Sequence, residues 1–333
     1  MKPSRCFCAL LVLALGLHAA SLQQQLQQMA AAYPGRVALY AHDLATGAVV
    51  ALDPDRPVPT ASVIKLGLLL EAMAQVKAGR LALDTPLELT AGNQVPGSGI
   101  LHLLTPGLRL DLKDALMLMI TLSDNTATNM VIDAVGLAPT NARLKAMGLK
   151  NTYFYKKVFQ PATGPMPADQ PQFGLGKTTA REMAEVMESI HRCDLGERAL
   201  CLDMITMLRN QQYRAMLPRY LDDGEASDGL SPIADKIGAL DAVRNDVALV
   251  YTRSGPVVIS IFTYDNPDHS WTPDNQAEIL IGRLAQAIVR TWSPAGLARR
   301  IADPLAMEPP PASNARGRSM NGLLPGRGGG WRG

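Results

Sequence analysis

The strongest constraint in the sequence is the placement of its β-rich segments, which lie on both sides of a long helical middle. Runs of β-branched and alternating apolar residues bounded by turn residues predict five strands. These are Val37–Asp43, Val49–Leu52, Ser231–Gly238, Asp246–Tyr251 and Val257–Tyr264. No crossover helix separates the last three, which favours an antiparallel sheet. We expect an α/β (α+β) fold in which a five-stranded antiparallel sheet flanked by helices joins an all-helical subdomain across a cleft.

Helical periodicity accounts for most of the rest of the chain. The predicted helices cover residues 21–33, Ser62 to about Lys77, a stretch after the N-cap candidate Asp111, Ala127–Val135 before the C-cap Gly136, a stretch from Thr179, and about 275–292. Thr179 and Glu182 have the spacing of a capping box. Prolines and glycines interrupt residues 151–177, where we expect a long irregular loop of the kind that is usually functional.

Both ends of the chain are predicted to lie outside the folded domain. Basic residues, an apolar run over 6–17 and small residues at 19–21 predict a secretory signal peptide over 1–20. An uncleaved anchor is the alternative. Export would place the protein in the periplasm or outside the cell. The composition of 303–333 predicts a disordered tail. The catalytic domain then spans 21–302, with a sheet lobe at about 21–61 and 222–302 and a helical lobe at about 62–221.

Composition argues against several partners. The formal net charge is only +2 and aromatic residues make up 5%, so no basic or base-stacking surface indicates nucleic acid. The five histidines are scattered and no Cys-x-x-Cys is present, so we expect no metal and no cofactor. We expect a monomer. Beyond the predicted signal only Cys193 and Cys201 remain. They either pair in an oxidising compartment or stay as two buried thiols.

A serine and a lysine are three residues apart where the first long helix is predicted to begin. Residues at this spacing share one helix face. The hydroxyl of Ser62 becomes a nucleophile only if a base takes its proton. Lys65 can be that base if burial or neighbouring positive charge lowers its pKa. Taken alone, the pair is a weak signal, and a helix-start serine with a solvated lysine explains it better.

Two further motifs follow in the chain. Ser123-Asp124-Asn125 joins two predicted helices, and its second hydroxyl could relay a proton while its amide holds a substrate carbonyl. Lys236-Ile237-Gly238 lies on a predicted strand, where the lysine could bind a carboxylate. The glycine of that motif allows close approach of a substrate backbone.

Together and in this order, the three motifs resemble those of the serine β-lactamase and penicillin-binding protein superfamily, most closely class A β-lactamases. The resemblance extends over roughly Val37 to Trp292. It includes Val95–Leu101, the decapeptide ITLSDNTATN at Ile120–Asn129, Ala234–Lys236 and Arg244–Asp246. It implies a β-lactamase/transpeptidase-like fold and an exported serine hydrolase that acts on a β-lactam or a peptidoglycan peptide.

The resemblance also implies roles for single residues. Ser62 would form the acyl-enzyme, Lys65 would take its proton, and Ser123 would pass a proton to the leaving nitrogen. Asn125 would hold the substrate amide. Lys236, with Arg244, would attract the substrate carboxylate. The backbone N–H groups of Ser62 and Ala239, the latter beside Gly238, would form the oxyanion hole.

Two departures from the family pattern affect these expectations. Class A enzymes carry a glutamate in the loop before Thr179, whereas the only acid from Thr152 to Arg181 is Asp169. Asp169 is therefore the one candidate for the deacylation base. Ile237 replaces the Thr or Ser of the family motif and removes a hydroxyl that would bond the substrate carboxylate. Three hypotheses result: a class A β-lactamase-like hydrolase, a D,D-peptidase or related penicillin-binding enzyme, and a binding homologue with weak or no catalysis.

Overall fold

The computed structural model describes residues 21–306. The predicted signal peptide over 1–20 and all but four residues of the predicted tail lie outside that range. No helix within it combines the length and apolarity needed to cross a membrane.

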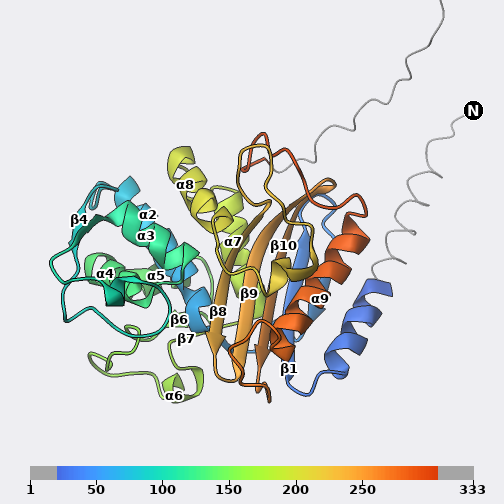
Figure 1. Cartoon of the computed structure of the whole chain (residues 1–333), viewed down its shortest axis with the longest axis horizontal. Coiled ribbons are helices and arrows are strands. Elements are labelled where there is room, and N and C mark those ends of the chain that lie inside the picture. Colours follow the sequence, from blue (N-terminus) through green and yellow to red (C-terminus); the bar gives the residue numbers. More distant parts are fainter. Residues whose placement is uncertain (1–20, 307–333) are drawn as a thin grey trace, which may run out of the picture.

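A five-stranded antiparallel sheet, in the order β2-β1-β10-β9-β8, forms the larger part of the molecule (Figure 1). Its strands are β1 (Arg36–Asp43), β2 (Val49–Leu52), β8 (Ile233–Leu240), β9 (Val243–Thr252) and β10 (Gly255–Tyr264). All five strand predictions are confirmed. Strand β9 is buried at every residue and β10 at all but its last, which explains the apolar runs Val247–Tyr251 and Pro256–Ile259 within them. β8 forms one free edge of the sheet and β2 the other.

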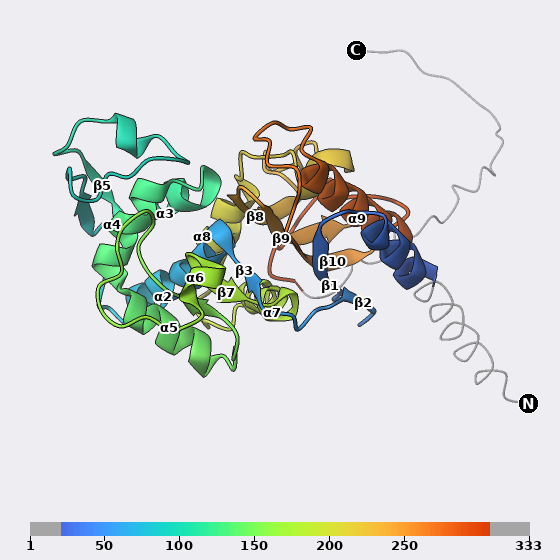
Figure 2. The same ribbon diagram turned by 90° about the horizontal axis from the view of Figure 1, so that it is seen from below.

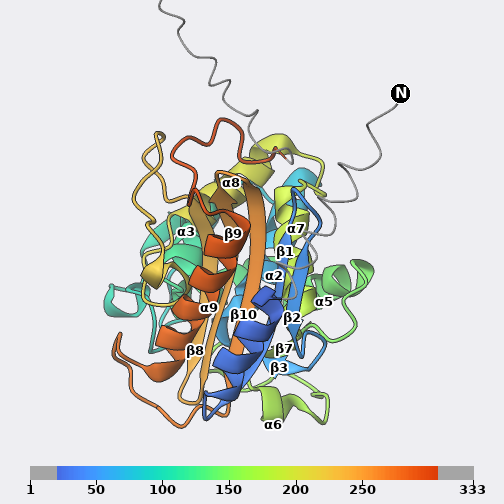
Figure 3. The same ribbon diagram turned by 90° about the vertical axis from the view of Figure 1, so that its right-hand side faces the viewer.

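Helices cover both faces of this sheet. The helix over 21–31 and α9 (Gln276–Trp292) lie on one face, as Figure 3 shows. α7 (Ala180–His191) packs on β1, β9 and β10 from the other face, and α8 (Arg198–Arg209) packs on β8. The predicted lobe boundary therefore needs correction, because it assigned α7 and α8 to the helical lobe. Their apolar stripes are buried against the strands.

The helical lobe lies beyond the β8 edge of the sheet (Figure 2). It contains α2 (Lys65–Lys77), α3 (Leu112–Thr121), α4 (Asn125–Val135) and α5 (Leu137–Ala146). The short elements of the chain are β3 (Val58–Pro59), η1 (Ala61–Ile64), β4 (Pro86–Glu88), η2 (Leu101–Leu103), β5 (Arg109–Asp111), β6 (Tyr153–Phe154), α6 (Gln170–Phe173), β7 (Gly176–Thr178) and η3 (Leu217–Tyr220). The predicted irregular loop over 151–177 thus holds β6, α6 and most of β7.

Local capping differs in part from the prediction. Gly136 ends α4 with φ +89°, as expected of a C-cap glycine. Thr179 caps α7 by accepting from the Glu182 N–H at 3.1 Å. The reciprocal half of the capping box is absent, because the Glu182 carboxylate accepts from Asn151 N–H and the Thr152 hydroxyl instead. This tertiary contact ties the start of the 151–177 segment to α7.

The ordered chain continues past the predicted domain end at residue 302. The carbonyl of Pro304 accepts a hydrogen bond from the Tyr251 hydroxyl at 2.8 Å, and Asp303 pairs with Arg198 at 2.9 Å. The prediction of a tail from 303 onward is therefore wrong for its first four residues. The rest of that prediction concerns residues outside the described range.

Cys193 and Cys201 form a disulfide, which resolves the alternative that the sequence left open. The bridge joins the end of α7 to α8 across eight residues of sequence. It restrains the turn between α7 and α8, which pack on the face of the sheet opposite α9.

We expect the double variant Cys193→Ser/Cys201→Ser to lose about 2 kcal/mol of unfolding free energy, because the open chain regains the entropy of a short closed loop. Urea unfolding monitored by circular dichroism measures the loss. Reductant should destabilise the parent by a similar amount and leave the variant unchanged. An unchanged urea midpoint in the oxidised variant would contradict the expectation.

Candidate active site

Ser62 lies on the 3₁₀ turn η1, between the foot of α2 and the sheet. The turn begins with Ala61 at φ +45°, a left-handed conformation that is costly for a residue with a Cβ. From the sheet, the Asn245 side-chain amide donates to the carbonyl of Thr60 at 3.1 Å. The side chain of Ser62 is partly exposed. The fold thus holds this hydroxyl on a strained, anchored turn where solvent and substrate reach it.

Gly238 on the edge strand β8 meets this turn at very short range. A Cβ at Gly238 would lie 2.7 Å from the Thr60 carbonyl oxygen and 3.0 Å from the Ser62 nitrogen. Only glycine therefore allows β8 and η1 to approach so closely. Ala239 follows on the same strand, so the two residues predicted to form the oxyanion hole lie on elements that are in contact.

Lys65 is the first residue of α2 and is fully buried. Its amine lies 2.8 Å from the Ser123 carbonyl oxygen, 3.2 Å from Ser123 Oγ and 3.1 Å from Asn125 Oδ1. Among the described residues, the Ser62 hydroxyl makes no hydrogen bond. The structure therefore joins Lys65 to the second motif and shows no hydrogen bond between Lys65 and Ser62.

The third motif reaches the same hydroxyl. The amine of Lys236, also fully buried, donates to Ser123 Oγ at 3.0 Å and to the Ile237 carbonyl at 2.7 Å. Burial lowers the pKa of Lys65 well below its ordinary value, and the neighbouring Lys236 lowers it further. Burial lowers the pKa of Lys236 to about 7, although Asp235 and Asp246 oppose that shift. Both shifts favour the neutral form of the amine, the form that can accept a proton.

The Ser-Asp-Asn segment owes its position to the buried carboxylate of Asp124. That carboxylate accepts from the Ala127 N–H at 2.8 Å, which caps α4, and from the Ile100 N–H at 2.7 Å. The preceding residue, Ser123, has φ +53°, which turns the chain between α3 and α4. The Asn125 amide nitrogen donates to the Pro96 carbonyl at 3.1 Å, so its oxygen faces Lys65.

Two buried acids lie behind the third motif. Asp235 pairs with Arg214 at 2.9 Å, and Asp246 accepts from the Leu217 N–H at 2.9 Å. Burial raises the pKa of Asp246 to about 7. The negative charges of Asp235 and Asp246 partly offset the buried positive charge of Lys236.

The expected role of Arg244 in binding a substrate carboxylate does not fit the structure. Its guanidinium is fully buried and pairs with Glu278, with Nε to Oε1 at 3.0 Å. The remaining nitrogens donate to backbone carbonyls of Leu240, Val243 and Ser270. Every nitrogen of Arg244 therefore has a partner within the protein, because β9 points its side chain at the start of α9.

The candidate deacylation base Asp169 precedes α6 in the long loop. Its carboxylate pairs with Lys177 at 2.5 Å and accepts from the Tyr155 hydroxyl at 2.8 Å. Hydrogen bonds from these two groups lower the pKa of Asp169. Its contacts stay within the loop and do not include the three motifs.

A cavity of about 300 Å³ extends from the catalytic motifs to residues that the sequence analysis missed. Ser123 and Ile237 line one part of it, and Tyr213, Trp271 and Glu278 line another. Glu278 lies in the first turn of α9, where an acidic residue already suits the helix N-terminus. Only the pairing of α9 with β9 reveals that it also faces the cavity.

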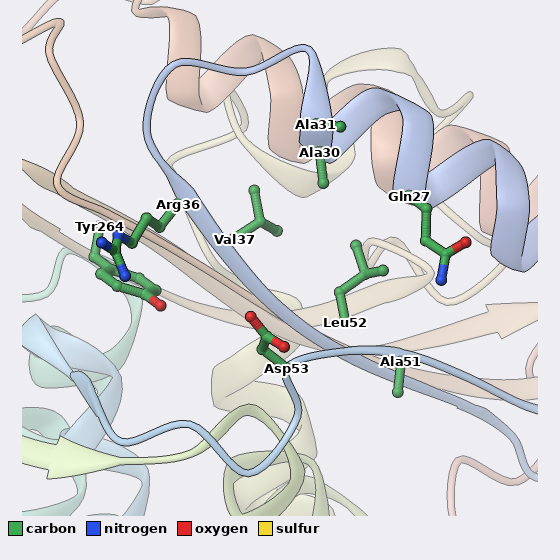
Figure 4. Close-up of a pocket in the computed structure, with 9 residues that line it drawn as sticks. All are labelled: Gln27, Ala30, Ala31, Arg36, Val37, Ala51, Leu52, Asp53 and Tyr264. Atoms are coloured by element: carbon green, nitrogen blue, oxygen red, sulfur yellow. The ribbon is translucent and has the colours of Figure 1, made fainter.

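A second hollow lies at the opposite edge of the sheet, between the helix over 21–31 and strands β1 and β2 (Figure 4). Figure 4 shows Arg36 beside Tyr264 at one end and Gln27 at the other. Its lining offers no serine, cysteine, histidine or lysine, and so no nucleophile with a base. Within residues 21–306 no three His, Cys, Asp or Glu side chains are grouped to hold a metal ion.

A family model described as the beta-lactamase enzyme family matches residues 21–292. The chain belongs to this family. Among solved structures, a beta-lactamase from Sphaerobacter thermophilus is 29% identical, with a TM-score of 0.69 over 82% of this chain and 95% of the other. A mutant of PBP-A, solved as an acyl-enzyme complex with penicillin G, is 26% identical, with a TM-score of 0.67 over 81% and 96%.

A curated relative bears a different kind of name. The chain is 24% identical over 288 residues to the beta-lactamase regulatory protein BlaB of Streptomyces cacaoi, which covers 75% of this chain and 91% of the relative. Membership of the beta-lactamase family identifies the chain as a beta-lactamase-like serine hydrolase by fold and family.

The buried carboxyl of Asp246 predicts a pH dependence of stability. Its pKa is about 7 in the folded protein and 3.8 ordinarily, so between these values the folded state keeps a proton that the unfolded state releases. Stability from this group is therefore present below pH 4 and is lost as pH rises to 7. In Asp246→Asn the unfolding free energy should fall less steeply with pH, by up to about 1.4 kcal/mol per pH unit.

Urea unfolding at several pH values from 4 to 7 measures this slope. Asp241→Asn is the matched control, because Asp241 is exposed at the turn of the same hairpin. That variant should keep the parent slope. Equal slopes for Asp246→Asn and the parent would contradict the assignment.

Proposed function

We propose that this chain hydrolyses β-lactams through an acyl-enzyme on Ser62, and that release of the acyl group limits turnover. The convergence of Lys65 and Lys236 on the Ser123 hydroxyl carries the proposal. It supplies a base with a lowered pKa and a proton relay, one helical turn from a partly exposed serine on a strained turn.

Acylation begins when Ser62 Oγ attacks the lactam carbonyl carbon and its proton passes to the neutral amine of Lys65. That transfer requires the amine to come within hydrogen-bond reach of Ser62 as the substrate binds. The helix N-terminus at Lys65 favours the negative charge that develops nearby. The N–H groups of Ser62 and Ala239 stabilise the oxyanion.

The leaving nitrogen then needs a proton as the C–N bond breaks. Ser123 Oγ lies 3.2 Å from the Lys65 amine and accepts from Lys236, so it donates its own proton and recovers one from protonated Lys65. The relay leaves Lys65 neutral. Asn125, held by the Pro96 carbonyl, is positioned to bind the substrate amide.

The loop glutamate that class A enzymes carry is missing here, so hydrolysis of the acyl-enzyme ester lacks that residue. The loop from Thr152 to Arg181 carries one acid, Asp169, and Lys177 and Tyr155 occupy it. This observation supports slow release and equally favours the second candidate, a D,D-peptidase or penicillin-binding enzyme that acts on peptidoglycan peptides. A third candidate, a regulatory binding protein, is favoured by the name of the relative BlaB and by the sequestered Arg244.

We further propose that the protein is exported. The N-terminal segment has the order of a signal peptide, and the Cys193–Cys201 disulfide suits an oxidising compartment.

Incubation with a reporter penicillin should add one acyl group to the protein, on the peptide that contains Ser62, and the adduct should decay slowly. Intact-mass and peptide mass spectrometry over time measure both events. Ser62→Ala should form no adduct, and Ser123→Ala should form it about a hundredfold more slowly. Ser254→Ala, at a distant hairpin turn, is the matched control and should behave like the parent. No adduct on folded parent protein would exclude the catalytic proposals.

Asp169→Asn should release the acyl group at a rate within about twofold of the parent, whereas loss of a true general base would slow release about a hundredfold. Lys177→Met is the matched control, since it breaks the same ion pair and keeps the carboxylate. Slower release in Asp169→Asn alone would identify Asp169 as the base. Equal slowing in both variants would point to loop geometry.

A further inference from the structure

Asn245 on β9 contacts the serine turn through one side-chain nitrogen. That nitrogen donates to two consecutive carbonyls, to Pro59 O at 2.9 Å and to Thr60 O at 3.1 Å. Asn245 is fully buried, and its side-chain oxygen has no hydrogen-bond partner among residues 21–306. The two carbonyls fix which way the amide faces, because its oxygen in the place of the nitrogen would meet two other acceptors.

The Pro59 carbonyl lies at the position from which a regular 3₁₀ turn would bind the Ser62 N–H. Such a turn joins each N–H to the carbonyl three residues earlier. The next residue follows this pattern, since the Val63 N–H donates to the Thr60 carbonyl at 3.2 Å. The bond from Ser62 to Pro59 is missing, and the Ser62 N–H has no acceptor within the part of the chain that the structure describes.

Two features account for the missing bond. Ala61, between the two groups, has φ +45°, which departs from the right-handed geometry of a 3₁₀ turn. Asn245 holds the Pro59 carbonyl toward the sheet. Without Asn245 that carbonyl would lose its donor, and the Ser62 N–H is the donor that the chain itself offers at the 3₁₀ spacing.

The free N–H lies beside the edge strand of the sheet. A Cβ at Gly238 would lie 3.0 Å from the Ser62 nitrogen, so the absence of a side chain leaves this nitrogen uncovered. Ala239 follows Gly238 on β8 and carries the second N–H expected in the oxyanion hole. A donor stabilises an oxyanion only if it is positioned in advance and not engaged elsewhere.

The turn has a further attachment that does not involve Asn245. The Thr60 N–H donates to the Gly176 carbonyl of β7 at 2.9 Å. The turn therefore stays tied to the long loop when Asn245 is replaced, and the effect of Asn245 on the Ser62 N–H can be measured by itself.

We propose that Asn245 is a positioning residue that keeps the Ser62 N–H free for the oxyanion by holding the Pro59 carbonyl on the sheet. The inference rests on acylation at Ser62, as proposed above, and assigns to that reaction a residue that does not touch the substrate. It also gives a reason for an amide at this buried position, where only the donor end has partners.

Asn245→Leu has nearly the same volume and removes the donor. With a reporter penicillin labelled with carbon-13 at the lactam carbonyl, the full-length variant should acylate at least about tenfold more slowly, since loss of a whole oxyanion donor costs about a hundredfold. The dissociation constant before acylation should change less than about twofold. In difference infrared spectra the ester carbonyl band of the acyl-enzyme should move to higher wavenumber, because the carbonyl accepts one hydrogen bond fewer.

Asn266→Leu is the matched control, because Asn266 is a buried asparagine at the end of β10 whose amide bonds Thr263 and Tyr33 and not the serine turn. It should keep the parent acylation rate and the parent band. A measurement on the parent needs no variant: the Ser62 amide should exchange with deuterium at least about tenfold more slowly in the acyl-enzyme than in the free protein.

Equal protection of the Ser62 amide in the free protein and in the acyl-enzyme would overturn this inference alone. So would a parent-like rate in folded Asn245→Leu, or slow acylation with an unshifted carbonyl band, which would make Asn245 a purely structural residue. No adduct on folded parent protein would overturn the proposed function with it.

Discussion

Two lysine amines and one serine hydroxyl hold the active site together across the lobe boundary. Lys65 and Ser123 belong to the helical lobe, and Lys236 belongs to the edge strand of the sheet. Burying two cations so close is costly, and the protein meets that cost by lowering both pKa values and by placing acids behind Lys236. The lowered pKa values of the two lysines and their positions therefore both depend on the meeting of the two amines at Ser123 Oγ. If the lobes separated, both the relay and the reason for the lowered pKa values would be lost.

Close packing between the sheet edge and the serine turn is the second requirement. Gly238 leaves no room for a side chain against Thr60 and Ser62, and Asn245 bonds the same turn from the next strand. Ser62 is thus positioned by the sheet although its turn, η1, leads directly into α2 of the other lobe. These tertiary contacts explain how the turn keeps Ala61 in a left-handed conformation that its local sequence does not favour.

The chemistry of the cleft separates into a part shared with the family and a part particular to this chain. Lys65 and the Ser-Asp-Asn turn lie in contact within a chain of the beta-lactamase enzyme family. At the end near α9, Glu278 pairs with the fully buried Arg244 and lines the cavity, which Arg244 does not.

Much of the fold follows from the sequence. Period-two and apolar runs predicted all five strands, because most residues of a sheet that is covered on both faces are apolar. The order of the three motifs likewise indicated one serine-centred site. Side-chain partners could not be predicted in this way. Glu182 fits a capping box but bonds Asn151, and Arg244 fits a carboxylate site but pairs with Glu278.

The sequence by itself determined the strands, most helices and the three motifs that meet in the candidate active site. Those properties depend on residue type and on neighbours within a few positions. The tertiary structure alone decided that Cys193 and Cys201 pair, that Asp169 is held by Lys177, and that Arg244 pairs with Glu278. Each of these depends on which segments come close together in the folded protein. The role of a charged side chain depends on its partner, and the partner is set by that tertiary contact.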